Sequence, residues 1–150
     1  NGYIITKYYG IEASIEIPIM FNSKSIKKIG DNSFKKCNNL INITIPSSVT
    51  SIGLYAFSYC TAEIIWDNTI ITEIGSGAFA SYKGTSITIP SSVISIGYLA
   101  FSNCSNLTGS PICGKNVINM ADTYLNCINL TGSPICEENV TYMGSTYYNC

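Results

Sequence analysis

Short stretches of alternating hydrophobic and polar residues recur along the chain, and the clearest spans residues 40–45. Alternation with a period of two predicts a β-strand with one buried face. We expect the inward residues to be Leu40, Ile43 and Ile45, and the outward residues to be Ile41, Asn42 and Thr44. Pro46 should end this strand, because proline cannot donate a hydrogen bond to a neighbouring strand.

This stretch belongs to a longer unit that occurs repeatedly. Residues 43–60 and 87–104 are nearly the same string, and residues 64–82 keep its Ile-Gly-x-x-Ala-Phe part. An aromatic residue recurs in steps of 22 or 23 residues, at Phe34, Phe57, Phe79, Phe101, Tyr124 and Tyr147. Self-similarity at a fixed period is typical of repeat proteins, and this period lies in the range of leucine-rich repeats.

A single unit of this size cannot bury its hydrophobic residues, but a stack of units can. We therefore predict a repeat solenoid: a leucine-rich-repeat-like right-handed coil with one parallel β-sheet of short strands, and with turns or short helical turns on the other face. Equivalent side chains would then lie above one another, so the recurring aromatic residues should form a continuous buried spine. A second buried column should contain Val49, Val93, Val117 and Val140.

Six units account for almost all of the chain after residue 14. Their expected boundaries are residues 15–37, 38–60, 61–82, 83–104, 105–127 and 128–150, and residues 1–14 should form an N-terminal cap or a partial repeat. The last unit carries no polar cap, which solenoids normally need. We expect the chain to be a fragment of a longer array.

Some units depart from the common pattern. The first contains an additional loop, IMFNSKS, between Pro18 and Ile26. The third has Trp66-Asp67 where other units have Ile-Pro, and Tyr82 where they have Cys. In the last two units serine, glycine and proline replace strand residues, so we expect a less regular sheet there.

The repeated phrase I-x-I-P-S-S-V-x-S-I-G-x-x-A-F-x-x-C, at residues 43–60 and 87–104, resembles the BspA-like class of leucine-rich repeats. The last two units are similar to a related variety, N-V-x-x-M-x-x-x-Y/F-x-x-C. The resemblance covers roughly residues 15–150. It implies a curved solenoid from a large secreted or cell-surface microbial protein that is used for adhesion or host contact. Because the motif residues are structural, it implies no catalytic residue.

The composition narrows the possible functions. The chain contains no His or Arg, and its net charge is −1, so neither a catalytic base of the usual kind nor an electrostatic nucleic-acid site is expected. No hydrophobic run is long enough to span a membrane. Six of the eight lysines lie within residues 1–36, which we interpret as a solubilising end rather than a site for an anionic polymer. We expect no enzymatic activity, cofactor or metal ion.

The seven cysteines are the remaining candidates for chemistry. Five close a unit, at Cys37, Cys60, Cys104, Cys127 and Cys150. Their side chains should point into the core in parallel, so we favour free, buried thiols over disulfides or a thiolate metal site. For Cys113 and Cys136, which occupy the Pro position, free and bridged forms are equally consistent with the pattern.

The preferred hypothesis is a non-enzymatic binding or adhesion module, extracellular or on the cell surface. It would present the outward β-face to a protein or glycan partner of a host or cell surface. The outward strand positions, which are mostly small, give the expected contact residues: Glu16, Thr44, Ile65, Thr88, Pro111 and Pro134. The alternative is a passive structural spacer, or stalk, within a larger surface or particle protein.

Overall fold

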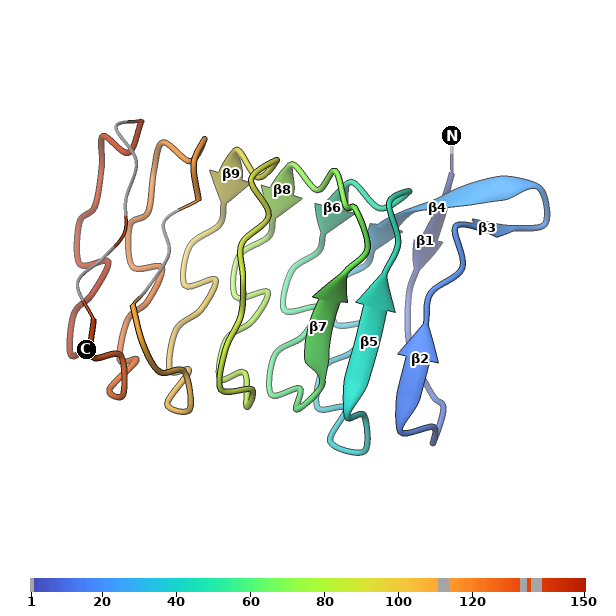
Figure 1. The fold of residues 1–150 in the computed structure, drawn as a ribbon, viewed down its shortest axis with the longest axis horizontal. Helices are drawn as coiled ribbons and strands as arrows, with labels where there is room; N and C mark the ends of the chain where they lie inside the picture. Colours follow the sequence, from blue (N-terminus) through green and yellow to red (C-terminus); the bar gives the residue numbers. More distant parts are fainter. Residues whose placement is uncertain (1, 111–113, 133–134, 136–138) are drawn as a thin grey trace.

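The computed structural model describes residues 2–110, 114–132, 135 and 139–150. The chain forms a solenoid of stacked coils with parallel strands, as predicted (Figure 1). The described residues contain strands, turns and bends but no helix. Of the turns or short helical turns that the sequence predicted, the structure therefore contains turns. Consequently, no described segment provides a long apolar helix of the kind that crosses a membrane.

Two sheets are present where the sequence predicted one. The three-stranded sheet has the order β2-β5-β7 and consists of β2 (Ser14–Glu16), β5 (Asn42–Ile45) and β7 (Glu63–Trp66). The larger sheet has the order β1-β4-β6-β8-β9, with β3 paired to β4. Its strands are β1 (Tyr3–Ile5), β3 (Met20–Phe21), β4 (Lys24–Ile29), β6 (Ser51–Ile52), β8 (Glu73–Ile74) and β9 (Ser95–Ile96).

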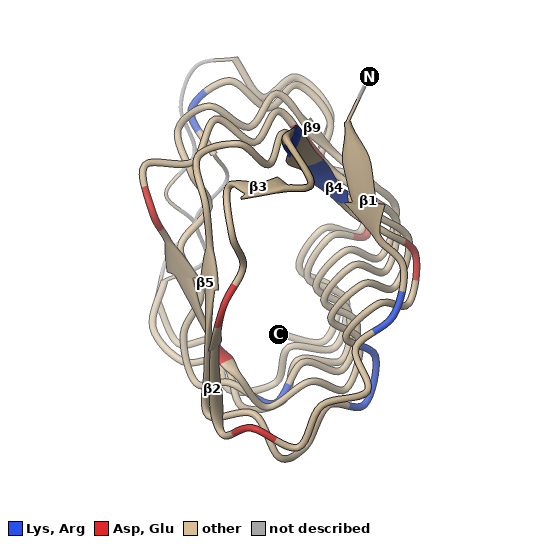
Figure 2. Ribbon diagram, turned by 90° about the vertical axis from the view of Figure 1, so that its right-hand side faces the viewer, with Lys and Arg blue, Asp and Glu red and all other residues tan. Residues whose placement is uncertain are grey.

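The second sheet has a simple local origin. After Pro46 the chain turns, with the Val49 amide donating to the Pro46 carbonyl at 3.1 Å, and then runs straight through Ser51 and Ile52. Along the solenoid axis, the two sheets lie on opposite sides of the coil (Figure 2). A strand of two residues is too short to produce a visible alternation in the sequence, which is why the second sheet was not predicted.

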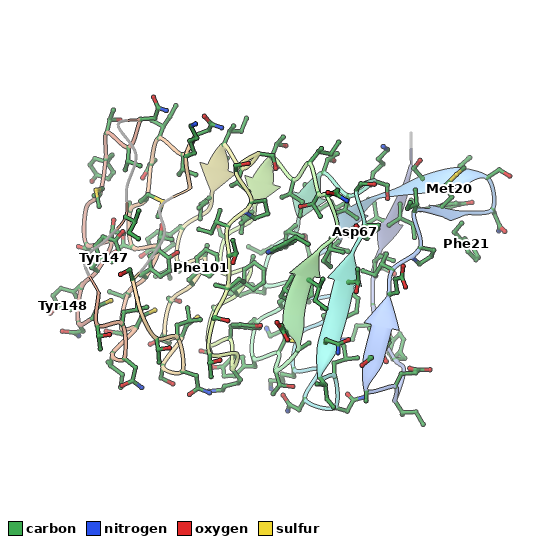
Figure 3. The ribbon with its side chains drawn as sticks, in the orientation of Figure 1. Met20, Phe21, Asp67, Phe101, Tyr147 and Tyr148 are labelled. Carbon is green, nitrogen blue, oxygen red and sulfur yellow. The ribbon has the colours of Figure 1, made fainter. Side chains whose placement is uncertain are left out.

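The predicted aromatic spine is present and runs through the whole stack. Ring centroids of successive members from Phe34 to Tyr147 lie 5.1–5.7 Å apart, with interplanar angles of 5–13°. Tyr8 extends the spine at its beginning, 5.5 Å from Phe34. Phe101, labelled in Figure 3, illustrates the interior position of these rings. Val49, Val93 and Val117 are fully buried as expected, and Val140 is partly buried.

The turns around the spine contain a regular backbone feature that the sequence did not reveal. In each coil the residues two places before and two places after the spine residue have positive φ angles. For Phe57 these are Tyr55 (φ 51°) and Tyr59 (φ 57°). The left-handed region is unfavourable for residues other than glycine. Here the turn hydrogen bonds and the bonds to the next coil, such as that from the Phe57 amide to the Ala78 carbonyl at 2.7 Å, hold it in place.

The additional segment of the first unit forms a β-hairpin rather than a loop. Met20 and Phe21 in β3 pair antiparallel with the start of β4. Asn22 (φ 45°) and Ser23 (φ 60°) form the turn, both with the positive φ angles of a tight hairpin. Met20 and Phe21 lie on the part of this hairpin that projects beyond the first coil (Figure 3). The ring of Tyr3 meets Phe21 edge-on at 5.8 Å.

Candidate partner-binding face

Three of the expected contact residues lie side by side on the three-stranded sheet. Thr44 in β5 is in register with Glu16 in β2 on one side and with Ile65 in β7 on the other. Glu16 and Ile65 are exposed and Thr44 is half-buried, whereas Ile43, between the outward positions of β5, is fully buried. The alternation predicted for residues 40–45 is therefore confirmed, and it positions these three residues in one row, which we call the β-face strip.

The strip continues to Thr88, but not through a strand. Residues 87–90 are identical in sequence to 43–46, yet they form no strand. Instead, Trp66 Nε1 donates to the Thr88 carbonyl at 2.8 Å, so a side chain joins the third coil to the fourth. We expected an irregular sheet only in the last two units, but the irregularity begins one unit earlier, beside Trp66, which replaces the isoleucine of the repeat. Thr88 is exposed, and Pro111 and Pro134 lie outside the described residues.

The strip carries little charge, but a cleft beside it carries both signs. Glu16 is the one ionisable residue among the four described strip positions. Glu63, at the beginning of β7, and Lys83, in the next coil, line an open cleft of about 350 Å³ together with Ile41 and Thr61. This face therefore offers a partner small polar and apolar side chains, with one carboxylate and one ammonium group at its side.

The unit-closing cysteines form hydrogen bonds within the stack of coils. The described cysteines are free, and Cys37, Cys60, Cys104 and Cys127 are buried as expected, although Cys150 is exposed. Cys104 Sγ donates to the Phe79 carbonyl and Cys127 Sγ to the Phe101 carbonyl, each at 3.0 Å. Burial raises the pKa of Cys60 to about 11, which keeps this thiol protonated and a poor nucleophile at neutral pH.

Two further chemical hypotheses concern metal binding and the remaining cysteines. Among the described residues, no three or more Cys, Asp or Glu side chains are grouped closely enough to hold a metal ion. Cys113 and Cys136, for which bridged and free forms were both open, lie outside the described residues.

Comparison with known repeat families identifies the architecture. The sequence model of the family described as BspA type leucine-rich repeat region matches residues 27–150, with six copies of the repeat. The chain belongs to this family. No protein of curated function matches it by sequence.

Solved structures of leucine-rich repeat proteins are similar to the chain. A leucine-rich cell surface protein from Faecalibacterium prausnitzii shares 31% identity with a TM-score of 0.82 over 99% of this chain and 42% of that one. The T. pallidum leucine-rich repeat protein TpLRR is 24% identical to this chain, with a TM-score of 0.78 over 99% of this chain and 81% of that one. The pneumococcal vaccine antigen PcpA shares 19% identity with a TM-score of 0.62, over 91% of this chain and 31% of that one.

One departure from the BspA-type pattern is accommodated by its neighbours. Tyr82, which replaces the closing cysteine, is fully buried, and its hydroxyl donates to the Ala62 carbonyl at 2.6 Å. Its ring meets Phe79 edge-on at 5.8 Å and covers Gly84, where a Cβ atom would lie 2.3 Å from the ring. The equivalent positions in other coils hold Asn39, Ala62, Asn106 and Asn129. The larger tyrosine thus occurs beside two small residues, Ala62 and Gly84.

Proposed function

We propose that this BspA-type repeat array is a non-enzymatic binding module of a cell-surface or secreted protein. The β-face strip would contact a protein or glycan partner. The observation that carries this proposal is the row formed by Glu16, Thr44 and Ile65, whose side chains point outward from three hydrogen-bonded strands in register. Such a row is held rigidly by the sheet, so little conformational entropy is lost when a partner binds.

Two further points support the proposal. The strip combines small polar residues with an exposed isoleucine, which is 42% accessible. An interface of this kind needs apolar contact area at its centre and polar groups around it. In addition, the Faecalibacterium prausnitzii structure that resembles this chain is described as a cell surface protein.

A binding screen against host-matrix proteins and glycans tests this proposal, with strip substitutions as the deciding step. Thr44→Lys and Thr88→Lys place long, charged side chains on the strip and should abolish any hit. Ser95→Lys is the matched control, because Ser95 is exposed in the same unit as Thr88 but belongs to the other sheet. Loss of binding with Ser95→Lys alone would move the contact surface to the larger sheet and contradict the proposal.

The alternative function is a spacer, and the continuous aromatic spine favours it specifically. Rings stacked at 5.1–5.7 Å make a rod whose length follows the number of coils. A spacer predicts that strip substitutions leave the function of the parent protein unchanged, whereas removal of whole repeats alters it. The two functions are therefore separated by comparing Thr44→Lys with deletion of one complete unit.

A further inference from the structure

A second surface, separate from the β-face strip, has the features of a linear binding site. It is a groove of about 780 Å³ that crosses several coils along the turn side of the solenoid. One wall is formed by the residues two places after the spine aromatics: Tyr59, Ser81, Asn103, Asn126 and Asn149. The other wall is formed by residues two places farther along the chain: Lys83, Ser105 and Ile128.

The three asparagines in the first wall form a ladder of side-chain amides. Asn126 Nδ2 donates to Asn103 Oδ1 at 3.1 Å, and Asn149 Nδ2 donates to Asn126 Oδ1 at 3.0 Å. An amide has two N–H donors and two acceptor lone pairs, so Asn126 keeps one of each after making both ladder bonds. The ladder therefore presents donors and acceptors to the groove at intervals set by the stacking of coils.

The backbone conformation does not by itself require asparagine at these positions. All three have positive φ angles, of 56–60°, which asparagine tolerates better than most residues. Yet Lys36 and Tyr59 adopt the same conformation at the equivalent positions of the first two coils, with φ angles of 61° and 57°. The run of amides along the groove therefore reflects the side-chain ladder and not the turn conformation alone.

The groove is better suited to sugar hydroxyls than to a peptide backbone. The main-chain amides of this wall already bond to the next coil: those of Asn103 to Leu125 at 2.7 Å and Asn126 to Tyr148 at 2.8 Å. An extended peptide would therefore find no free strand edge to pair with. Hydroxyl groups donate and accept together, as the remaining amide groups and Ser81 and Ser105 do.

The spacing of the coils also matches a repeating ligand. The spine rings beneath this wall lie 5.2 Å apart from Phe101 to Tyr124 and 5.7 Å apart from Tyr124 to Tyr147. This is close to the advance per sugar of an extended β-linked hexopyranose chain. At one end of the groove, Lys83 Nζ lies over the ring of Tyr59, 5.9 Å from its centroid. Tyr59 is 45% exposed, and the part of its ring that Lys83 leaves uncovered provides an apolar contact for the last sugar.

We propose that this groove binds a linear, neutral, β-linked polysaccharide, with about one sugar for each coil. Isothermal titration calorimetry with β-1,4-linked hexasaccharides of glucose, mannose and N-acetylglucosamine tests the proposal on the whole chain. At least one hexasaccharide should bind, and more tightly than its disaccharide, because the longer ligand reaches more coils. Binding should also shift the side-chain amide NMR signals of Asn103, Asn126 and Asn149.

Asparagine substitutions locate the site. Asn126→Ala removes the centre of the ladder and should weaken binding about tenfold, since it deletes ligand hydrogen bonds and frees its neighbours to rotate. Asn149→Ala, at the exposed end, should weaken binding less and fold normally. The matched control is Asn116→Ala: Asn116 bonds to the Ser91 carbonyl of the previous coil at 2.9 Å, and neither residue lines the groove, so its loss should leave saccharide affinity unchanged.

Several outcomes would overturn the proposal. They are the absence of binding by all three saccharides, unchanged affinity in Asn126→Ala, and binding of a serine- and asparagine-rich peptide of similar length in place of the saccharides. Loss of saccharide binding in Thr44→Lys but not in Asn126→Ala would assign the sugar to the β-face strip. If only the β-face strip proposal is wrong, Thr44→Lys will leave partner binding unchanged, while the groove will still bind saccharide.

Discussion

The fit between Tyr82 and Gly84 can be tested by a change that would normally stabilise a protein. Gly84 has no positive φ angle, so replacing it with alanine would ordinarily gain about 0.4–1 kcal/mol by restricting the unfolded chain. Here the new Cβ atom would lie 2.3 Å from the Tyr82 ring. That ring is fully buried, and its hydroxyl is fixed to the Ala62 carbonyl at 2.6 Å, so it cannot move aside.

We therefore expect Gly84→Ala to destabilise the wild-type chain by about 1–3 kcal/mol, the usual cost of overpacking. In the background of Tyr82→Cys, which restores the residue found in most units, the obstacle is absent. There the same substitution should be neutral or stabilising by up to about 1 kcal/mol. The coupling energy between the two positions should thus be about 1–4 kcal/mol.

Equilibrium urea unfolding followed by circular dichroism measures all four variants of this cycle, provided that the m-value stays constant. Tyr82→Phe serves as the milder control: it keeps the ring over Gly84, loses the bond to Ala62 and should cost about 1 kcal/mol. If Gly84→Ala stabilised the wild-type chain, or if the two substitutions were additive, the tight contact between this ring and the glycine would be refuted.

Four further predictions concern the spine, the turns and the thiols. Phe79→Ala should lower the free energy of unfolding in urea by about 3–5 kcal/mol, because Phe79 is fully buried between two rings. Tyr147 is only partly buried, so Tyr147→Ala should lower it clearly less, and equal losses would contradict this prediction. Asp122 has a φ angle of 52°, so Asp122→Gly should raise and Asp122→Val should lower the melting temperature, a result reversed if the turn were not left-handed. Burial raises the pKa of Cys60 to about 11, so its stabilising effect should be complete below about pH 9 and lost as the pH rises through 11 in pH-dependent unfolding. At pH 8, iodoacetamide mapped by mass spectrometry should modify the exposed Cys150 before Cys60, and uniform labelling would argue against a closed stack.

Much of the fold followed from the sequence because identical coils place identical residues in identical environments. The period of the aromatic residues predicted the spine, and the alternation in residues 40–45 predicted which side chains of β5 face the core. What the repeat could not predict depends on neighbours rather than on the unit itself. Residues 43–46 and 87–90 are the same string, ITIP, yet only the former contributes to a strand. The latter meets the previous coil through the Trp66 side chain, which donates to the Thr88 carbonyl.

The candidate sites show the same division. Outward positions of the β-face strip could be predicted by counting along a strand, since side chains alternate with a fixed period. The groove could not be predicted in this way, because its wall consists of turn residues with positive φ angles. Residue types such as tyrosine and lysine, found at Tyr59 and Lys36, do not indicate that conformation. The one available signal was the recurrence of asparagine at residues 103, 126 and 149, two places after each of the last three spine aromatics.

The stacked coils also determine how the molecule would respond to tension. Each coil is joined to the next by backbone hydrogen bonds and one ring contact. An outer coil has a neighbour on one side only, so a load pulling the ends apart would detach it before an inner one. Every detachment would release 22 or 23 residues, roughly 75 Å of extended chain. An array of this kind lengthens in equal steps at a nearly constant force, and so limits the strain transmitted between whatever it connects.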